Sequence, residues 1–170
     1  METEIKHARA LTEAEQHKLF SWGEDIFEVQ PLTLRWRHKD VRFVLYDQGE
    51  PVSHAGILKH SVSVNGEPVS VVGLGGVVTV PEAQGKGFAR QLVRHAMRFA
   101  EGEWKVDAGL LFCRPQMVAY YEGLGWQVVE SPVIIEQPSG KIASPLQVMV
   151  LPFGEVCWPA GSVDLQSLPW

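Results

Sequence analysis

The sequence is poor in cysteine, has no long hydrophobic run and carries no excess of basic residues. Its two cysteines, Cys113 and Cys157, lie far apart and have no histidine beside them, which argues against a disulfide framework and against a metal site. We therefore expect two buried, reduced thiols. No apolar segment approaches the roughly 18 residues of a membrane-spanning helix, and the first residues lack the apolar region of a signal peptide. These absences predict a cytoplasmic protein without a membrane partner.

The balance of charge and hydrophobicity is that of an ordinary globular chain. The protein has 170 residues, of which 45% are hydrophobic and 21% charged, and its formal net charge is −5. A nucleic-acid partner would usually require a basic face, so we expect none. A chain of this length suits one domain with a sizeable core. We expect residues 1–170 to form that domain, either as a monomer or as a homodimer.

One stretch, from Val69 to Phe99, organises the chain. Residues 69–80 are β-branched and glycine-studded, which predicts a buried strand, and Pro81 prevents that strand from continuing. Residues 84–89 then open a helix that we expect to continue to about Ala100. Glycines let the backbone approach a ligand, and the free N–H groups of a first helical turn attract anions. The stretch therefore predicts a cradle for a phosphate or pyrophosphate.

The spacing of the glycines indicates which kind of cradle this is. It fits neither the P-loop nor the dinucleotide-binding fingerprint, because the glycines of residues 73–76 lie within the strand. Instead, Gln84, Gly87 and Ala89 resemble the acyl-CoA signature R/Q-x-x-G-x-G/A of the GNAT superfamily of N-acyltransferases. The resemblance implies acetyl-CoA as cosubstrate and no metal. It implies that the cosubstrate is bound by Val78, Thr79, Val80, Gln84, Gly85, Lys86, Gly87, Phe88, Ala89 and Arg90.

A second signature follows in the order that the first one implies. Residues 121–126, with the sequence YEGLGW, are similar to the Y-x-x-x-G-F/W segment that closes the acyl-CoA site of GNAT enzymes. The two signatures cover about residues 40–152. They imply an α/β (α+β) GNAT acyl-CoA N-acyltransferase fold, with a mixed, mostly antiparallel central sheet flanked by helices. Residues 1–39 should supply a first strand and substrate-side helices, and residues 153–170 a C-terminal strap.

Two local signals outside these signatures predict particular elements. Thr12 and Glu15 form a capping box, which opens a helix that we expect to continue until Pro31 stops it. Asn65-Gly66 is the strongest short hairpin signal, so the strand over residues 52–64 should pair with the organising strand. A sequence of antiparallel strands before the cradle helix is also the order that the GNAT resemblance implies.

The chemistry that the resemblance implies needs a proton donor and a proton acceptor. Tyr121 occupies the position that protonates the departing CoA thiolate in similar enzymes, and a packed aromatic with a satisfied hydroxyl is the alternative. Many relatives carry a glutamate on the fourth strand as base, but the matching positions here are Gly73, Gly75 and Gly76. His54 on the adjacent strand is the best titratable substitute, since histidine titrates in the useful range. A structural histidine and a bound water chain are the alternatives.

Two regions are candidates for binding the amine. Glu24, Asp25 and Glu28 cluster in the sequence, which predicts a wall for an ammonium group, with a solvated helix end as the alternative. The tail, with CWPAG at residues 157–161 followed by a last Trp170, is similar to aminoglycoside 2′-N-acetyltransferases and, in part, to the nodulation N-acyltransferase. That resemblance implies that Trp170 lies near a cationic substrate. An apolar strap that only covers the sheet is the alternative.

The hairpin over residues 52–66 is similar to the same two groups of enzymes. We therefore expect an N-acetyltransferase that moves the acetyl group of acetyl-CoA to a primary amine of a small cationic molecule, aminoglycoside-, aminosugar- or polyamine-like, by direct attack. Two alternatives stay open. One is an acyl-CoA-binding regulatory module without turnover, which the missing glutamate favours. The other is a protein or peptide N-acetyltransferase.

Overall fold

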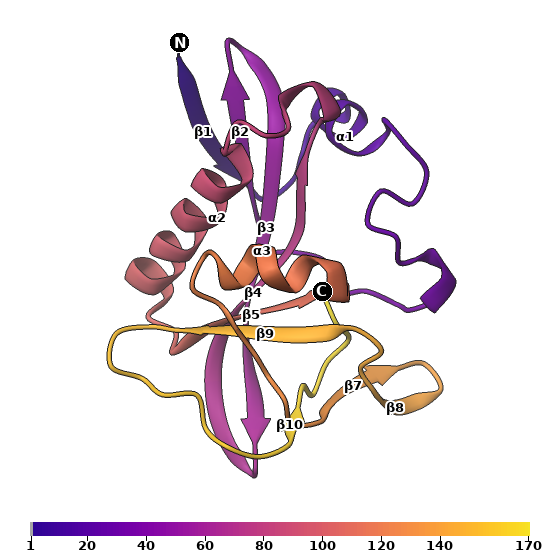
Figure 1. Cartoon of the computed structure of the whole chain (residues 1–170), viewed down its shortest axis with the longest axis vertical. Coiled ribbons are helices and arrows are strands. Elements are labelled where there is room, and N and C mark those ends of the chain that lie inside the picture. Colours follow the sequence, from indigo (N-terminus) through magenta and orange to yellow (C-terminus); the bar gives the residue numbers. More distant parts are fainter. Residues whose placement is uncertain (1) are drawn as a thin grey trace.

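One mixed sheet runs through the whole molecule, and helices lie against it (Figure 1). A computed structural model describes residues 2–170. Its strands follow the order β6-β9-β5-β4-β3-β10-β7-β8, with β2 also paired to β3 and β1 to β2. Two of the strand pairs, β4–β5 and β7–β10, are parallel, and the other described pairs are antiparallel. The mixed, mostly antiparallel sheet flanked by helices is confirmed.

The first four strands form a meander. They are β1 (Thr3–Ala8), β2 (Val41–Asp47), β3 (Glu50–Val64) and β4 (Glu67–Thr79). The turn between β3 and β4 falls on Asn65 and Gly66, as predicted, with φ of 49° and 85°. Both residues of such a turn need positive φ, which asparagine and glycine tolerate best. Because β3 and β4 are long, this hairpin forms the spine of the sheet.

The first helix is shorter than the sequence pattern indicated. The capping box of Thr12 and Glu15 is confirmed, but α1 (Glu13–Phe20) already ends at Phe20. The expectation of a helix continuing to Pro31 is wrong. Residues 21–29 are irregular instead, and Asp25 has a φ of 43°. Its carboxylate accepts the backbone N–H groups of the residues four and five positions further on, so a local turn replaces the helix.

The second half of the chain builds the rest of the sheet and the two remaining α-helices. α2 lies along one flank of the sheet, and α3 crosses in front of it in the view of Figure 1. Short 3₁₀ or π turns precede or follow α2 and α3, and a further 3₁₀ turn, η1 (Gln30–Leu32), precedes β2. The other elements are η2 (Pro81–Ala83), α2 (Phe88–Phe99), η3 (Ala100–Trp104), β5 (Ala108–Cys113), η4 (Pro115–Met117), α3 (Val118–Glu122), β6 (Gln127–Val128), β7 (Val133–Gln137), β8 (Gly140–Ala143), β9 (Gln147–Pro152) and β10 (Val163–Asp164).

Strands β4 and β5 separate part-way along their length. They pair in parallel from Val71 opposite Ala108 to Leu74 opposite Leu111, and β4 then continues to Thr79 without that partner. On its other edge, β4 stays paired with β3 to Thr79, while β5 stays paired with β9. The two halves of the sheet therefore open away from each other beyond Leu74. This opening positions the candidate site.

Two hydrophobic clusters hold the layers together. The larger one joins the helices to the sheet and includes Leu92, Val93 and Ala96 of α2. The smaller one contains Leu165 and Trp170 of the tail, packed with residues of β3, β4, β5 and β9. A fully buried leucine contributes about 1.5–3 kcal/mol relative to an exposed one, so the tail adds to the core as well as covering it.

The cysteines differ from the expectation in one respect. Both are free thiols, and Cys113 is buried, but Cys157 is exposed, so the prediction of two buried thiols is wrong for Cys157. It lies in the irregular segment between β9 and β10, where several neighbouring residues are exposed as well. Within residues 2–170, no helix is long and apolar enough to span a membrane.

Candidate functional site

The predicted cradle is an exposed loop that leads into α2. Gly85 and Gly87 have φ of 79° and 80°, a conformation that L side chains rarely adopt, and no other described atom lies within 4 Å of where their Cβ atoms would be. Gly87 is the residue that caps α2. The amide of Gln84 donates a hydrogen bond to the carbonyl of Thr79 at 3.0 Å and so closes the turn. The result is open backbone at a helix N-terminus, which suits an anion.

The residues predicted to bind the cosubstrate fall into two groups, one with exposed and one with buried side chains. Of the side chains after the turn, those of Gln84, Lys86 and Arg90 are exposed, whereas Phe88 is 8% exposed and anchors α2 in the core. Val78 and Val80 are also buried, so these strand residues can offer a ligand their backbone but little side chain. A ligand could therefore contact one continuous run of backbone, from β4 through the turn to α2.

A bulge in β4 lies just upstream of the cradle. Gly76 and Val77 on β4 stand opposite a single residue, Ala55, of β3. Gly76 has a φ of 62°, and its carbonyl lies 2.6 Å from Nδ1 of His54, which donates the hydrogen bond when it carries the ring proton. A bulge redirects the backbone groups of the strand that carries it. His54 thus holds the bulge in place from the neighbouring strand.

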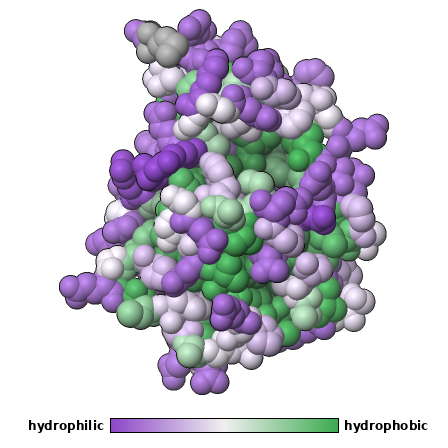
Figure 2. Space-filling view, in the orientation of Figure 1, coloured by the Kyte–Doolittle hydropathy of each residue, from purple (hydrophilic) through white to green (hydrophobic). Residues whose placement is uncertain are grey.

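A groove of about 430 Å³ opens where β4 and β5 separate. Hydrophobic surface also gathers near the middle of the face shown in Figure 2, framed by hydrophilic side chains. The groove lining is mostly apolar and comes from several separate parts of the chain. It comprises Ile26, Phe27, Glu28, Val29, Trp36, Lys39, Leu74, Gly75, Gly76, Val77, Leu111, Phe112, Cys113, Arg114, Gln116, Met117, Tyr121, Leu146 and Trp170.

Tyr121 lines this groove from α3. It is 7% exposed and packs edge-on against Trp126, with ring centroids 6.2 Å apart, and against Tyr120. Burial raises the pKa of the Tyr121 hydroxyl well above its ordinary value. The phenol therefore stays protonated at neutral pH and has a proton to give, while burial also makes it a weaker acid than an exposed tyrosine.

His54 does not lie in the groove lining, and its pKa differs from the expectation. The side chain is fully buried, with its ring 5.0 Å from that of Phe20. Burial is the main cause that lowers the pKa of His54, to about 4, against the smaller opposing effect of its hydrogen bond to Gly76. The prediction of a pKa in the useful range is therefore wrong. A neutral, enclosed imidazole that holds a bulge matches the structural alternative better than it matches a base.

The acidic cluster predicted for the amine does not converge on the groove. Glu24 is exposed and outside the lining, and Asp25 uses its carboxylate to cap the backbone of Val29 and Gln30. Glu28 lines the groove, where its Oε2 accepts a hydrogen bond of 2.8 Å from the Gln116 amide. One of the three predicted carboxylates is thus available to a ligand there.

Trp170 both covers the sheet and lines the groove. It is 3% exposed, and its indole Nε1 donates a hydrogen bond to the carbonyl of Leu110 at 3.1 Å. The indole stands over Gly73, where a Cβ atom would lie 2.4 Å from the ring. Its main-chain carbonyl carbon would lie 3.0 Å from a Cβ atom on Gly75, at the opening between the strands. The position of Trp170 in the lining agrees with its predicted place beside a substrate, whose binding remains a prediction.

Sequence reasoning missed Lys39, which reaches the groove through a slot between two strands. Gly56 and Gly75 are cross-strand neighbours in β3 and β4. A Cβ atom on Gly56 would lie 2.4 Å from Cγ of Lys39, and one on Gly75 would lie 2.6 Å from Cε and 3.0 Å from Nζ. The lysine stem fills the space that these two glycines leave. The facing glycines were the only signal, and it becomes visible only once the strand register is known.

Arg114 was also missed. It follows β5 in the groove lining, and its Nε is buried without a hydrogen-bond partner among residues 2–170. Together with Lys39 it places two cationic side chains in the groove, against the single carboxylate of Glu28. In the same described range, no group of three or more His, Cys, Asp and Glu side chains is placed to hold a metal ion.

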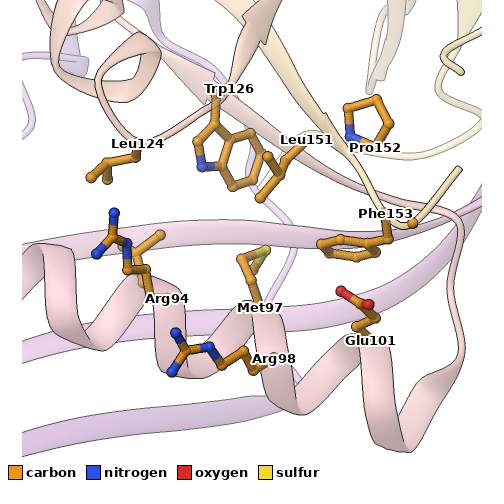
Figure 3. Close-up of a pocket in the computed structure, with 11 residues that line it drawn as sticks. Arg94, Met97, Arg98, Glu101, Leu124, Trp126, Leu151, Pro152 and Phe153 are labelled. Carbon is orange, nitrogen blue, oxygen red and sulfur yellow. The ribbon is translucent and has the colours of Figure 1, made fainter. Parts of the chain in front are cut away.

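A second, smaller hollow of about 250 Å³ lies at the other end of α2. Arg94, Met97 and Arg98 of α2 form one wall, and Trp126 and Phe153 face them (Figure 3). It shares no lining residue with the groove between β4 and β5. Tyr121 and the bulge residues Gly76 and Val77 line the groove but not this hollow. The groove beside the bulge is therefore the candidate active site.

A comparison with protein families agrees with this arrangement. A model described as an acetyltransferase (GNAT) domain matches residues 7–129, which include β2 to β4, the cradle and α3. The chain belongs to the GNAT acetyltransferase family. Comparison with curated protein sequences found no match. The GNAT family assignment also accounts for the strand-turn-helix order that the two signatures predicted.

Solved structures show that the GNAT fold extends over nearly the whole chain. The GNAT family N-acetyltransferase YhbS from Escherichia coli, solved in complex with CoA, is 16% identical, with a TM-score of 0.60 over 96% of this chain and 89% of that chain. A GNAT family acetyltransferase from Brucella melitensis, solved in complex with acetyl-CoA, is 18% identical, with a TM-score of 0.56 over 95% and 94%. At these identities the likeness shows the fold alone.

Proposed function

We propose that this GNAT enzyme transfers the acetyl group of acetyl-CoA to a primary amine of a small molecule bound in the groove between β4 and β5. The observation that carries the proposal is the continuity of one backbone run. The same strand that lines the groove at Gly75–Val77 continues through the turn into the exposed glycine cradle before α2. A cosubstrate with its pyrophosphate at the cradle would therefore direct its thioester toward Tyr121. The CoA and acetyl-CoA of the two similar structures support this choice of cosubstrate.

The reaction needs one bond formed and one bond broken. A neutral amine nitrogen attacks the thioester carbonyl carbon, so that a C–N bond forms, and the C–S bond then breaks to release the CoA thiolate. Tyr121 donates its hydroxyl proton to the sulfur and regains a proton from the adduct nitrogen. Backbone N–H groups of the β4 bulge are suited to stabilise the oxyanion that forms in between. The products are an acetamide and CoA.

We also propose how much positive charge the amine substrate carries. Glu28 and the tail's similarity to aminoglycoside 2′-N-acetyltransferases support a cationic amine, such as an aminosugar or a polyamine. Lys39 and Arg114 act against a highly charged polycation, because like charges in a half-buried groove repel. We therefore place amines with one positive charge ahead of polyamines.

A second candidate function is an acyl-CoA-binding module without turnover. One observation favours it: His54 is enclosed and holds the bulge, so neither histidine nor a strand carboxylate offers the amine a base within the groove. Glu82, the first carboxylate after the groove residues of β4, forms an ion pair with Lys18 at 2.5 Å on the surface. A water chain or an amine that arrives neutral would restore turnover without any of these groups.

The test is release of the CoA thiol from acetyl-CoA across a panel of monoamines, aminosugars, polyamines and peptides. We expect release on one class of small amines, reduced about tenfold or more by Tyr121→Phe because a general acid is lost. Tyr120→Phe is the matched control, since Tyr120 is the neighbouring tyrosine, does not line the groove and is 37% exposed. Binding of acetyl-CoA without release on any amine would favour the module, and equal effects of the two variants would remove Tyr121 from the mechanism.

A further inference from the structure

The groove contains a nucleophile that the proposed reaction does not use, the amino group of Lys39. The lysine stem lies across Gly56 and Gly75 and ends beside the β4 bulge, where β4 and β5 have just separated. In that position Nζ lines the same groove as Gly76, Val77 and Tyr121. These are the groups that the acetyl thioester would meet.

The surroundings of Lys39 give it a larger uncharged fraction than an exposed lysine has. No ion pair holds its Nζ within residues 2–170. Burial, helped by the neighbouring positive charge of Arg42, lowers the pKa of Lys39 to about 8. A free carboxylate on Trp170, whose carbonyl carbon lies 3.0 Å from the same Gly75 Cβ position, would raise it again. The other charged or titratable groups nearby are His54 on β3, Asp40 next to it in the chain, and Glu28, Cys113, Arg114 and Tyr121 in the groove.

We propose that Lys39 is a self-acetylation site, at which the enzyme transfers the acetyl group of bound acetyl-CoA to its own lysine. The inference rests on the proposed function, because it requires acetyl-CoA in the groove. The neutral Nζ attacks the thioester carbon, a C–N bond forms, and the C–S bond breaks. One proton of the lysine nitrogen goes to the CoA thiolate, directly or through Tyr121, so the products are acetyl-lysine and CoA.

Acetylation of Lys39 would inhibit the transfer to amines and would not be a step in it. An amide, unlike a thioester, does not pass its acetyl group on to an amine, so Lys39 would accept one acetyl group per chain and then stop. The acetylated side chain loses its positive charge and extends into the groove, where an acceptor amine has to bind. We therefore expect acetylated protein to release CoA more slowly on the amines that the unmodified protein uses.

The experiment measures where and how fast the purified chain acquires an isotope-labelled acetyl group from acetyl-CoA. Intact mass gives the number of groups, and mass spectrometry of proteolytic fragments gives the rate at each lysine. Lys59 and Lys105 are both exposed and serve as references for uncatalysed acetylation. Because the thioester is held beside it, Lys39 should be labelled at least about tenfold faster than either reference. Excess CoA should suppress the labelling of Lys39 and leave the references unchanged.

Two variants make the site assignment specific. Lys39→Arg keeps a cation but removes the amine that accepts the acetyl group, so only the slow labelling of the reference lysines should remain. Gly75→Ala keeps Lys39 in the sequence but puts a methyl group 2.6 Å from the position of its Cε, so the side chain has to move and labelling should slow. Labelling of Lys39 no faster than the references, while acetyl-CoA still raises the melting temperature, would overturn the inference and leave the proposed function standing. If acetyl-CoA does not bind at all, the proposed function fails and the inference fails with it.

Discussion

The two halves of the candidate site are built in opposite ways. The cradle side, residues 78–90, is one uninterrupted segment, and its glycine turn is exposed backbone. The acceptor side is the groove together with the bulge beneath it, and it combines residues from the segments around 26–39, 74–77, 111–121, 146 and 170. Its polar groups, such as His54, Lys39 and Tyr121, are buried or half-buried. The cradle side therefore depends on local conformation, and the acceptor side on packing and desolvation.

The largest expected effect tests whether desolvation controls the acceptor side. His54 has a pKa of about 4 in the folded state and an ordinary value of 6.5, so the unfolded chain binds more protons between these two pH values. The stability that neutral His54 contributes is complete above pH 6.5 and is lost as pH falls toward 4. The loss amounts to about 3 kcal/mol of unfolding free energy. Denaturant titrations at a series of pH values measure it.

The control for this prediction is His54→Asn, which removes the titrating group. The variant should be less stable at pH 7 because the bulge loses its support, but its stability should fall less between pH 6.5 and 4 than that of the original protein. Two other histidines with lowered pKa values, His60 and His95, stay in both proteins and cancel in the difference. Parallel pH profiles for the two proteins would show that His54 is not the desolvated group.

The next effect tests whether the cradle side depends on backbone conformation and charge alone. Gly87→Asp places a side chain at a φ of 80° and a negative charge where the pyrophosphate should lie. We expect acetyl-CoA to bind about a hundredfold more weakly, which corresponds to about 2.7 kcal/mol. Calorimetric titration with acetyl-CoA measures it. Gly66→Asp is the matched control, with a φ of 85° and equally open surroundings at the far hairpin turn, and it should leave binding unchanged.

The smallest effect concerns the ion pair that joins α1 to the cradle turn. Lys18 and Glu82 are 39% and 59% exposed, so water screens their attraction. Lys18→Met should therefore lower the melting temperature by about 2 °C at most, and high salt should remove even that difference. Lys141→Met, which breaks the pair with Asp164 at the other end of the sheet, should behave alike. A shift several times larger for Lys18→Met alone would mean that the cradle depends on tertiary support after all.

The sequence predicted the fold class and the framework of the cradle side well. The capping box of Thr12, the Asn65-Gly66 turn and the glycine loop before α2 are local signals, and each one fixes φ, ψ or a hydrogen bond within a few residues. The extent of the first helix was predicted wrongly. The local turn capped by Asp25 replaced a helix there, although the capping box at Thr12 had predicted one up to Pro31.

The acceptor side depends on strand register and burial, which the order of residues along the chain does not reveal. His54 and Lys39 are both titratable residues near β3, yet the histidine is enclosed beside Gly76 while the lysine emerges through the gap left by Gly56 and Gly75. Which of the two reaches the groove depends on strand register and on the position of the bulge. The pKa of each depends on how much water the surrounding elements exclude.

The sequence by itself therefore determined the family, the order of the strands around the cradle and the position of the open glycine turn before α2. Those features arise from conformational preferences of neighbouring residues, which act over short distances along the chain. Only the tertiary structure decided which side chains line the groove. Burial and register are properties of segments that meet in space, and Lys39, Arg114 and Trp170 share the groove although the chain separates them widely.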